Sequence, residues 1–139
     1  MLHPGELICR AGEALIAGRL EAMAKAYSYP CVIAMNNVQH ILREPREIIE
    51  VLAVFREDLL RQGVVAARTN LDSQVIFNED MAFLNVHAVF YDADGGEVTD
   101  SRTSYVMRQN LEHWEIITVS VDKKANYTPG ACLLENEAA

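Results

Sequence analysis

Residues 27–63 read YSYPCVIAMNNVQHILREPREIIEVLAVFREDLLRQG, and they contain the clearest signals for the order of helices and strands. Its first part contains two short apolar runs, which an asparagine pair at 36–37 separates. Asparagine tolerates the positive φ that a two-residue hairpin turn requires, so residues 31–42 predict a small β-hairpin. A helix is the alternative interpretation, because periodicity alone does not distinguish short apolar strands from helices.

The second part of this stretch predicts a long amphipathic helix. Pro45 suits the first turn of a helix, and Glu47 lies near the positive end of the helix dipole. Apolar residues then recur at spacings of three and four, at Ile48, Val51, Leu52, Phe55 and Leu59. Gly63 provides the C-terminal stop.

Upstream, the residues from about Glu6 to Tyr27 predict a first helix. Leu7, Ala11, Leu15, Ala22 and Met23 recur near a helical period. Proline disfavours the α conformation of the residue before it, so we expect this helix to end just before Tyr29.

The chain after Gly63 is typical of β structure. Alternating polarity and many β-branched residues predict four strands, at residues 64–77, 81–91, 98–109 and 114–121. Short polar turns join them, so sequential strands should pair as an antiparallel meander. The two helices can bury their apolar faces only against this sheet, which predicts a two-layer α+β domain.

Length and composition indicate one globular domain. A chain of 139 residues can bury roughly two thirds of the surface that its unfolded form exposes. We expect the domain to occupy residues 1–124. Residues 125–139 contain Pro129, Gly130 and a polar end, and are expected to form a C-terminal extension.

Charge and motif content argue against several classes of protein. The net charge is −8, whereas nucleic acids and anionic membranes bind basic surfaces, so neither is an expected partner. Charges interrupt the N-terminal apolar residues, which argues against a signal peptide or spanning helix and favours a cytoplasmic protein. Three cysteines without a CxxC motif are typical of reduced thiols. The sequence lacks phosphate-binding loops and spaced metal ligands, so it predicts no cofactor and no metal site.

The order of these features resembles the nuclear transport factor 2-like superfamily, a cystatin-like α+β cone that SnoaL-like polyketide cyclases share. The residues that carry the resemblance are Tyr27, Tyr29, Pro30, Pro45, Glu47, Gly63, Val64 and Trp114-Glu115-Ile116. It spans roughly residues 6–123. The resemblance implies a strongly bent antiparallel sheet packed around N-terminal helices, with a pocket between them. It also implies a homodimer through the outer face of the sheet, which the helices leave uncovered.

The strand predicted at 81–91 has two contrasting faces. One carries Phe83, Asn85, His87, Val89 and Tyr91, and the other carries only Ala82, Leu84, Val86, Ala88 and Phe90. If the apolar face meets the helices, Asn85 and His87 lie on the outer face. If the mixed face lines the cone, they become polar anchors of a ligand pocket, and this second arrangement is favoured for His87.

The last strand adds further candidates. Trp114, Ile116, Thr118 and Ser120 should share one face and align with Met107, Tyr105 and Thr103. The predicted ligand-binding residues are therefore Tyr29, Asn85, His87, Tyr105 and Trp114. The catalytic candidates are weaker, and they are His87 as a base and Asp100 as an acid.

Three functions fit this interpretation, because a superfamily fold does not specify a reaction. The first is binding of a small hydrophobic ligand. The second is a cofactor-independent isomerase, dehydratase or cyclase acting on a polyketide-like or terpenoid-like substrate. The third is a non-catalytic dimerisation module, whose cone would be filled with side chains. A cavity of a few hundred Å³ would separate the first two from the third.

Overall fold

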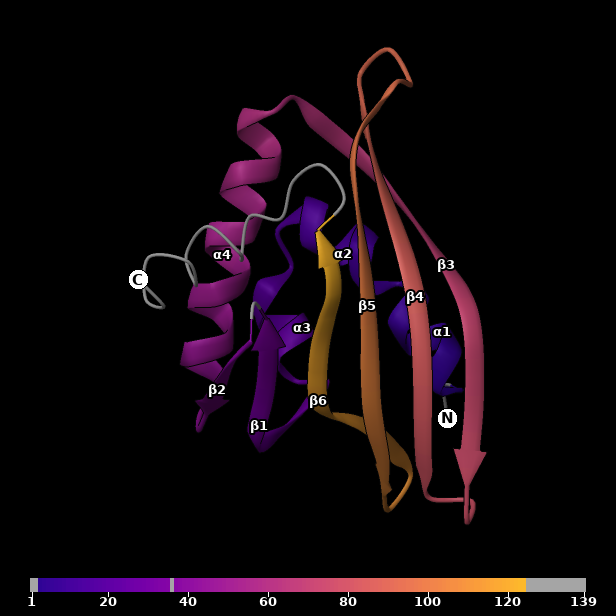
Figure 1. The fold of residues 1–139 in the computed structure, drawn as a ribbon. Helices are drawn as coiled ribbons and strands as arrows, with labels where there is room; N and C mark the ends of the chain where they lie inside the picture. Colours follow the sequence, from indigo (N-terminus) through magenta and orange to yellow (C-terminus); the bar gives the residue numbers. More distant parts are fainter. Residues whose placement is uncertain (1–2, 36, 125–139) are drawn as a thin grey trace.

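The protein forms a six-stranded sheet with four helices packed on one of its faces (Figure 1). The structure is a computed structural model and describes residues 3–35 and 37–124. The helices are α1 (Pro4–Cys9), α2 (Ala11–Ala17), α3 (Leu20–Ala24) and α4 (Pro45–Arg61). The strands are β1 (Tyr27–Met35), β2 (Val38–Leu42), β3 (Val64–Phe77), β4 (Met81–Asp92), β5 (Glu97–Asn110) and β6 (His113–Lys124). The predicted α+β architecture, with helices first and the meander last, is confirmed.

The sheet has the strand order β2-β1-β6-β5-β4-β3. Strands β3 to β6 form the predicted antiparallel meander, because short turns join each strand to its neighbour. Strand β1 lies beside β6 in parallel, and β2 closes the sheet as an antiparallel edge. The sheet is therefore mixed, and the expected antiparallel pairing is correct for every strand pair except β1 and β6.

The hairpin and the long helix of residues 27–63 are both present. Met35 pairs with Val38 across the turn, and Asn37 has the positive φ, 64°, that this turn requires. Helix α4 begins at Pro45, and Gly63 follows its end with a φ of 87°. This left-handed conformation explains why a glycine stands at the stop.

The N-terminal segment forms three short helices, so the prediction of one helix from Glu6 to Tyr27 is wrong. A turn at Arg10 separates α1 from α2, and Gly18 ends α2 in the left-handed conformation with a φ of 80°. Glycine adopts this conformation at little steric cost, which ends a helix that apolar periodicity alone would continue. Tyr27 already begins β1, so Pro30 lies within a strand and not at a helix end.

A β-bulge in β6 changes which of its residues face the helices. The register of β5 against β6 shifts at Ile117, which is an extra residue on β6. An extra residue reverses the alternation of side chains along a strand. Trp114 therefore shares the inner face with Val119, and the prediction that Thr118 and Ser120 lie on that face is wrong.

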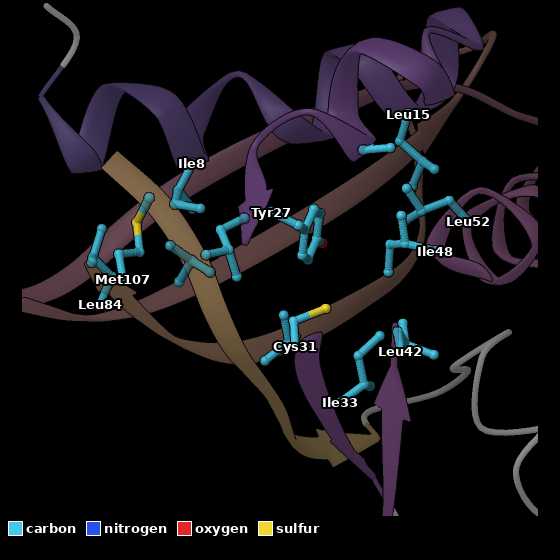
Figure 2. Close-up of a cluster of buried hydrophobic side chains, with 14 of the residues drawn as sticks. Ile8, Leu15, Tyr27, Cys31, Ile33, Leu42, Ile48, Leu52, Leu84 and Met107 are labelled. Carbon is cyan, nitrogen blue, oxygen red and sulfur yellow. The ribbon is translucent and has the colours of Figure 1, made fainter. Parts of the chain in front are cut away.

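The hydrophobic core lies between the inner face of the sheet and the helices. Figure 2 shows side chains from every layer converging around Tyr27: Ile8 and Leu15 from the N-terminal helices, Ile48 and Leu52 from α4, Cys31, Ile33 and Leu42 from the hairpin, and Leu84 and Met107 from the meander. Full burial of one such aliphatic side chain contributes about 1.5–3 kcal/mol. This core fixes the helices over the sheet.

The predicted C-terminal extension, residues 125–139, lies outside the described residues, as does Cys132. Within them, Cys31 is fully buried, Cys9 is half-buried, and both are free thiols. None of the helices in this part of the chain combines the length and the apolar character needed to cross a membrane.

Candidate ligand-binding cavity

A cavity of about 220 Å³ lies between the helices and the inner face of the sheet. Its helix-side wall is apolar and includes Leu7, Ile8, Leu15, Met23, Leu52 and Phe55. The sheet contributes Val86, Ala88 and Phe90 from β4 and Ile116 from β6. The cone is therefore not completely filled by side chains, and most of the cavity surface is hydrophobic.

Strand β5 supplies a row of hydroxyl groups to this apolar wall. Ser101, Thr103 and Tyr105 are alternate residues of β5 and all line the cavity. Thr69 on β3 lies level with Ser101, because both pair with Ala88 of the strand between them. Among the side chains that the structure describes, which end at Val121, none is a hydrogen-bond partner of these hydroxyls. They can therefore bond to a molecule in the cavity.

Two phenol groups add hydrogen-bond donors. Burial raises the pKa of Tyr105 to about 12. The pKa of Tyr27 is also raised well above its usual value, first by burial and then by its neighbour Tyr105. Both phenols stay protonated at neutral pH. They can donate hydrogen bonds to an oxygen atom, but they cannot act there as ionised bases.

Arg10 is the one charged residue among the described residues that line the cavity. It lies between α1 and α2, and its side chain is exposed. Within the described part of the chain, the lining contains no Asp, Glu or His. Among the described residues, no group of three or more His, Cys, Asp and Glu side chains is arranged to hold a metal ion. The cavity thus presents neutral donors and one cation.

Three of the five predicted ligand-binding residues can be compared with these walls directly. Tyr105 lines the cavity, and its role in binding remains a prediction. Tyr29 does not line it; its hydroxyl donates a hydrogen bond to the Ala24 carbonyl oxygen at 2.7 Å, which joins β1 to the end of α3. Trp114 is buried in the core, where it packs as part of the inner face. Tyr29 and Trp114 thus lie on the inner side of the sheet, as predicted, but they are not part of the cavity wall.

Asn85 and His87 lie on the outer face of the sheet, so the prediction that they anchor ligand in the cone is wrong. The Asn85 amide nitrogen donates to Ser73 Oγ at 2.7 Å, and its oxygen accepts a bond from Ser104 Oγ at 2.6 Å. His87 Nε2 lies 2.7 Å from Asp100 Oδ2. They face outwards because the other face of β4 is wholly apolar, and the hydrophobic effect favours burial of that face against the helices.

Sequence reasoning did not identify Arg10, Thr69 and Ser101 as lining residues. It placed the junction at Tyr27 beside the pocket but did not predict the Tyr27 phenol as a donor, because Tyr27 was expected to end a helix. Ser101 could not be assigned because polar residues occupy both faces of β5, so the alternation along this strand does not show which face points towards the helices. Only the pairing of β5 with the clearly amphipathic β4 identifies its inner residues.

The strand order, the helices on one face and the cavity between the two layers define a nuclear transport factor 2-like protein. Residues 10–124 match the model of the family described as NTF2-like protein (DUF6841), and the chain belongs to this family. The resemblance found in the sequence is thus confirmed. No functionally curated protein matches the chain.

Solved structures share the same fold. A domain of unknown function with a cystatin-like fold from Nostoc punctiforme has a TM-score of 0.67 and 18% identity, covering 96% of this chain and 83% of that one. An NTF2-like protein with a cystatin-like fold from Novosphingobium aromaticivorans has a TM-score of 0.62 and 18% identity, covering 93% and 84%. An NTF2-like protein of unknown function from Shewanella oneidensis has a TM-score of 0.62 and 12% identity, covering 83% and 92%. At these identities the likeness concerns the fold alone.

Proposed function

We propose that this protein binds a small, largely apolar organic molecule in the cavity between its helices and the inner face of its sheet. The observation that carries this proposal is the combination of apolar walls with a row of hydroxyls that have no partner in the described residues. Ligand sites are commonly apolar clefts with a few well-placed polar groups. Hydroxyls both donate and accept, so they suit a ligand with carbonyl or hydroxyl oxygens.

The volume limits the size of the molecule. An apolar protein cavity of about 150 Å³ accommodates benzene, and the present cavity has about 220 Å³. It is smaller than the pockets of about 300–1,000 Å³ that hold drug-sized ligands. We therefore expect a ligand with one ring or a short branched chain, not a multi-ring molecule.

An enzyme of the isomerase, dehydratase or cyclase kind is less well supported. Such reactions need a general base within hydrogen-bond reach of the substrate. His87 and Asp100 lie on the opposite face of the sheet from the cavity. Tyr27 and Tyr105 keep their protons at neutral pH because burial raises their pKa values. The cavity lining therefore supports binding better than proton abstraction.

A homodimer through the outer face of the sheet is proposed as the assembly. Val75, Phe77 and Phe83 are exposed at 50%, 42% and 47% on the outer side of β3 and β4. The rings of Phe77 and Phe83 pack edge to face with their centroids 5.2 Å apart. Exposed apolar patches of this kind favour association. A dimerisation role alone, without a ligand, does not account for the cavity.

Ligand binding can be tested with a substitution on the sheet that fills the cavity. Ala88 lies between Thr69 and Ser101 in the register, so Ala88→Phe places a ring in the cavity. The matched control is Ala66→Phe, which makes the same change at an exposed position of β3. A thermal-shift screen of one-ring ketones, phenols and carboxylates should give hits with the wild type and Ala66→Phe, and none with Ala88→Phe. Hits that persist in a folded Ala88→Phe would refute binding in this cavity.

A further inference from the structure

The charge distribution around the cavity indicates the chemical class of the ligand. Of the cavity-lining residues that the structure describes, Arg10 is the one that is charged, although the whole chain has a net charge of −8. A single cation in an otherwise neutral wall favours an anion and disfavours a cation. An uncharged ligand would form no ionic interaction with Arg10.

The guanidinium of Arg10 is available for an external anion. No carboxylate of the described residues forms an ion pair with it, whereas Arg61 pairs with Asp58 and Arg102 with Asp72. The guanidinium of Arg56 on α4 donates hydrogen bonds to the Ile16 carbonyl oxygen. Arginine binds carboxylates through two parallel hydrogen bonds. Arg10 can therefore receive a carboxylate at the edge of the cavity.

The interior of the cavity does not suit a second charge. Its polar groups are the hydroxyls of Thr69, Ser101 and Thr103 and the two protonated phenols of Tyr27 and Tyr105. Neutral donors of this kind can bind an uncharged oxygen, but an additional ionised group would lose its hydration without a compensating counter-ion. The ligand should therefore be charged at one end only.

We propose that the ligand is a small organic monocarboxylate, with a body of about one ring in the cavity and its carboxylate on Arg10. This inference rests on the proposed ligand-binding function and specifies its ligand. The cavity volume of about 220 Å³ limits the body, and the hydroxyl row of β5 favours a hydroxyl or carbonyl substituent on it.

The experiment compares carboxylates with their primary amides. Benzoate, phenylacetate and cyclohexanecarboxylate are titrated into the protein by calorimetry, alongside benzamide, phenylacetamide and cyclohexanecarboxamide. Each amide keeps the shape of its acid and removes the charge. The variant is Arg10→Gln, and the matched control is Arg19→Gln, because Arg19 is also exposed on the N-terminal segment but does not line the cavity.

In the wild type and in Arg19→Gln, at least one carboxylate should bind about threefold or more tightly than the corresponding amide. In Arg10→Gln, the carboxylate and the amide should bind with equal affinity. Raising the salt concentration should weaken binding of the carboxylate and not of the amide. If amides bind as well as acids, the monocarboxylate inference fails while the ligand-binding function stands. If neither series binds, both fail. Amide-proton shifts on the inner residues of β5, in NMR spectra of the wild type, locate the site independently of any variant.

Discussion

His87 Nε2 lies 2.7 Å from Asp100 Oδ2, across neighbouring strands on the face of the sheet that points away from the helices. Both side chains are 22% exposed. A histidine beside a carboxylate is the usual arrangement of a general base with its orienting group. Here the pair belongs to a polar outer surface, together with the hydrogen-bonded chain Ser73, Asn85 and Ser104. Its geometry resembles a catalytic dyad, but its location separates it from the cavity.

The first prediction concerns this pair. His87→Ala should leave binding of a cavity ligand unchanged within about twofold, because the side chain lies on the other face of β4. The cost in stability should be about 1 kcal/mol or less, since the partly exposed pair is screened by solvent. Asp100→Asn should behave in the same way. Calorimetric titration and urea unfolding measure the two effects, and a tenfold loss of affinity in either folded variant would contradict the assignment of the cavity.

Most of the fold can be predicted from local signals in the sequence. Pro45 and Gly63 mark both ends of α4, and the asparagine pair marks the turn of the hairpin. The N-terminal segment is the exception. Gly18 adopts the left-handed conformation and ends α2, although the apolar periodicity continues beyond it. The sequence does not show which of its several glycines ends a helix in this way.

The candidate site is harder to predict, because it depends on which face of each strand meets the helices. The apolar face of β4 gives the answer for that strand, and the alternative that placed His87 in the cone is excluded by the burial of Leu84 and Val86. On β6, the bulge at Ile117 moves Thr118 to the outer face, and a bulge leaves no clear mark in a sequence. Only the pairing between strands reveals it.

The second prediction concerns alkaline pH. Burial raises the pKa of Tyr105 to about 12, whereas an unfolded tyrosine titrates near 10. The unfolded chain therefore loses this proton first. The contribution of Tyr105 to stability is complete below about pH 10 and is lost as the pH rises towards 12. Tyr29 shifts in the same direction, also because of burial.

We expect the free energy of unfolding of the wild type to fall by about 1–2 kcal/mol between about pH 9 and pH 11.5 through Tyr105. This is less than a full two-unit shift would give, because the ring faces the cavity and is only half-buried. Tyr105→Phe should reduce the fall. Thr103→Val is the control, since it alters the same wall without removing a titrating group. Equal pH slopes in all three proteins, measured by urea unfolding, would show that the Tyr105 phenol is not desolvated.

The third prediction concerns the close approach of α2 to β3. A Cβ atom on Gly12 would lie 2.7 Å from Thr69 Oγ1 and 3.3 Å from the Ala67 Cβ. Replacing a helical glycine by alanine would otherwise stabilise the helix by about 1 kcal/mol. Here the overlap should reverse the sign, so Gly12→Ala should destabilise the protein by about 1–3 kcal/mol.

A double-mutant cycle separates this overlap from a general effect of α2. In a Thr69→Ala background the hydroxyl is absent, so the cost of Gly12→Ala should fall by about 1 kcal/mol or more. Urea unfolding of the four proteins provides the coupling energy. Strict additivity would mean that the helix and the strand are not in contact at this point.

The last prediction concerns the proposed homodimer. Phe83→Glu places a charge among Val75, Phe77 and Phe83 on the outer face, where two copies would bring two such charges together. It should convert the dimer to a monomer in sedimentation velocity at micromolar concentration, with ligand affinity unchanged because the cavity lies on the other face. The matched control is Leu111→Glu, which changes a side chain that is 88% exposed in the turn between β5 and β6. A wild type that sediments as a monomer, or a Phe83→Glu variant that remains a dimer, would rule out assembly through this face.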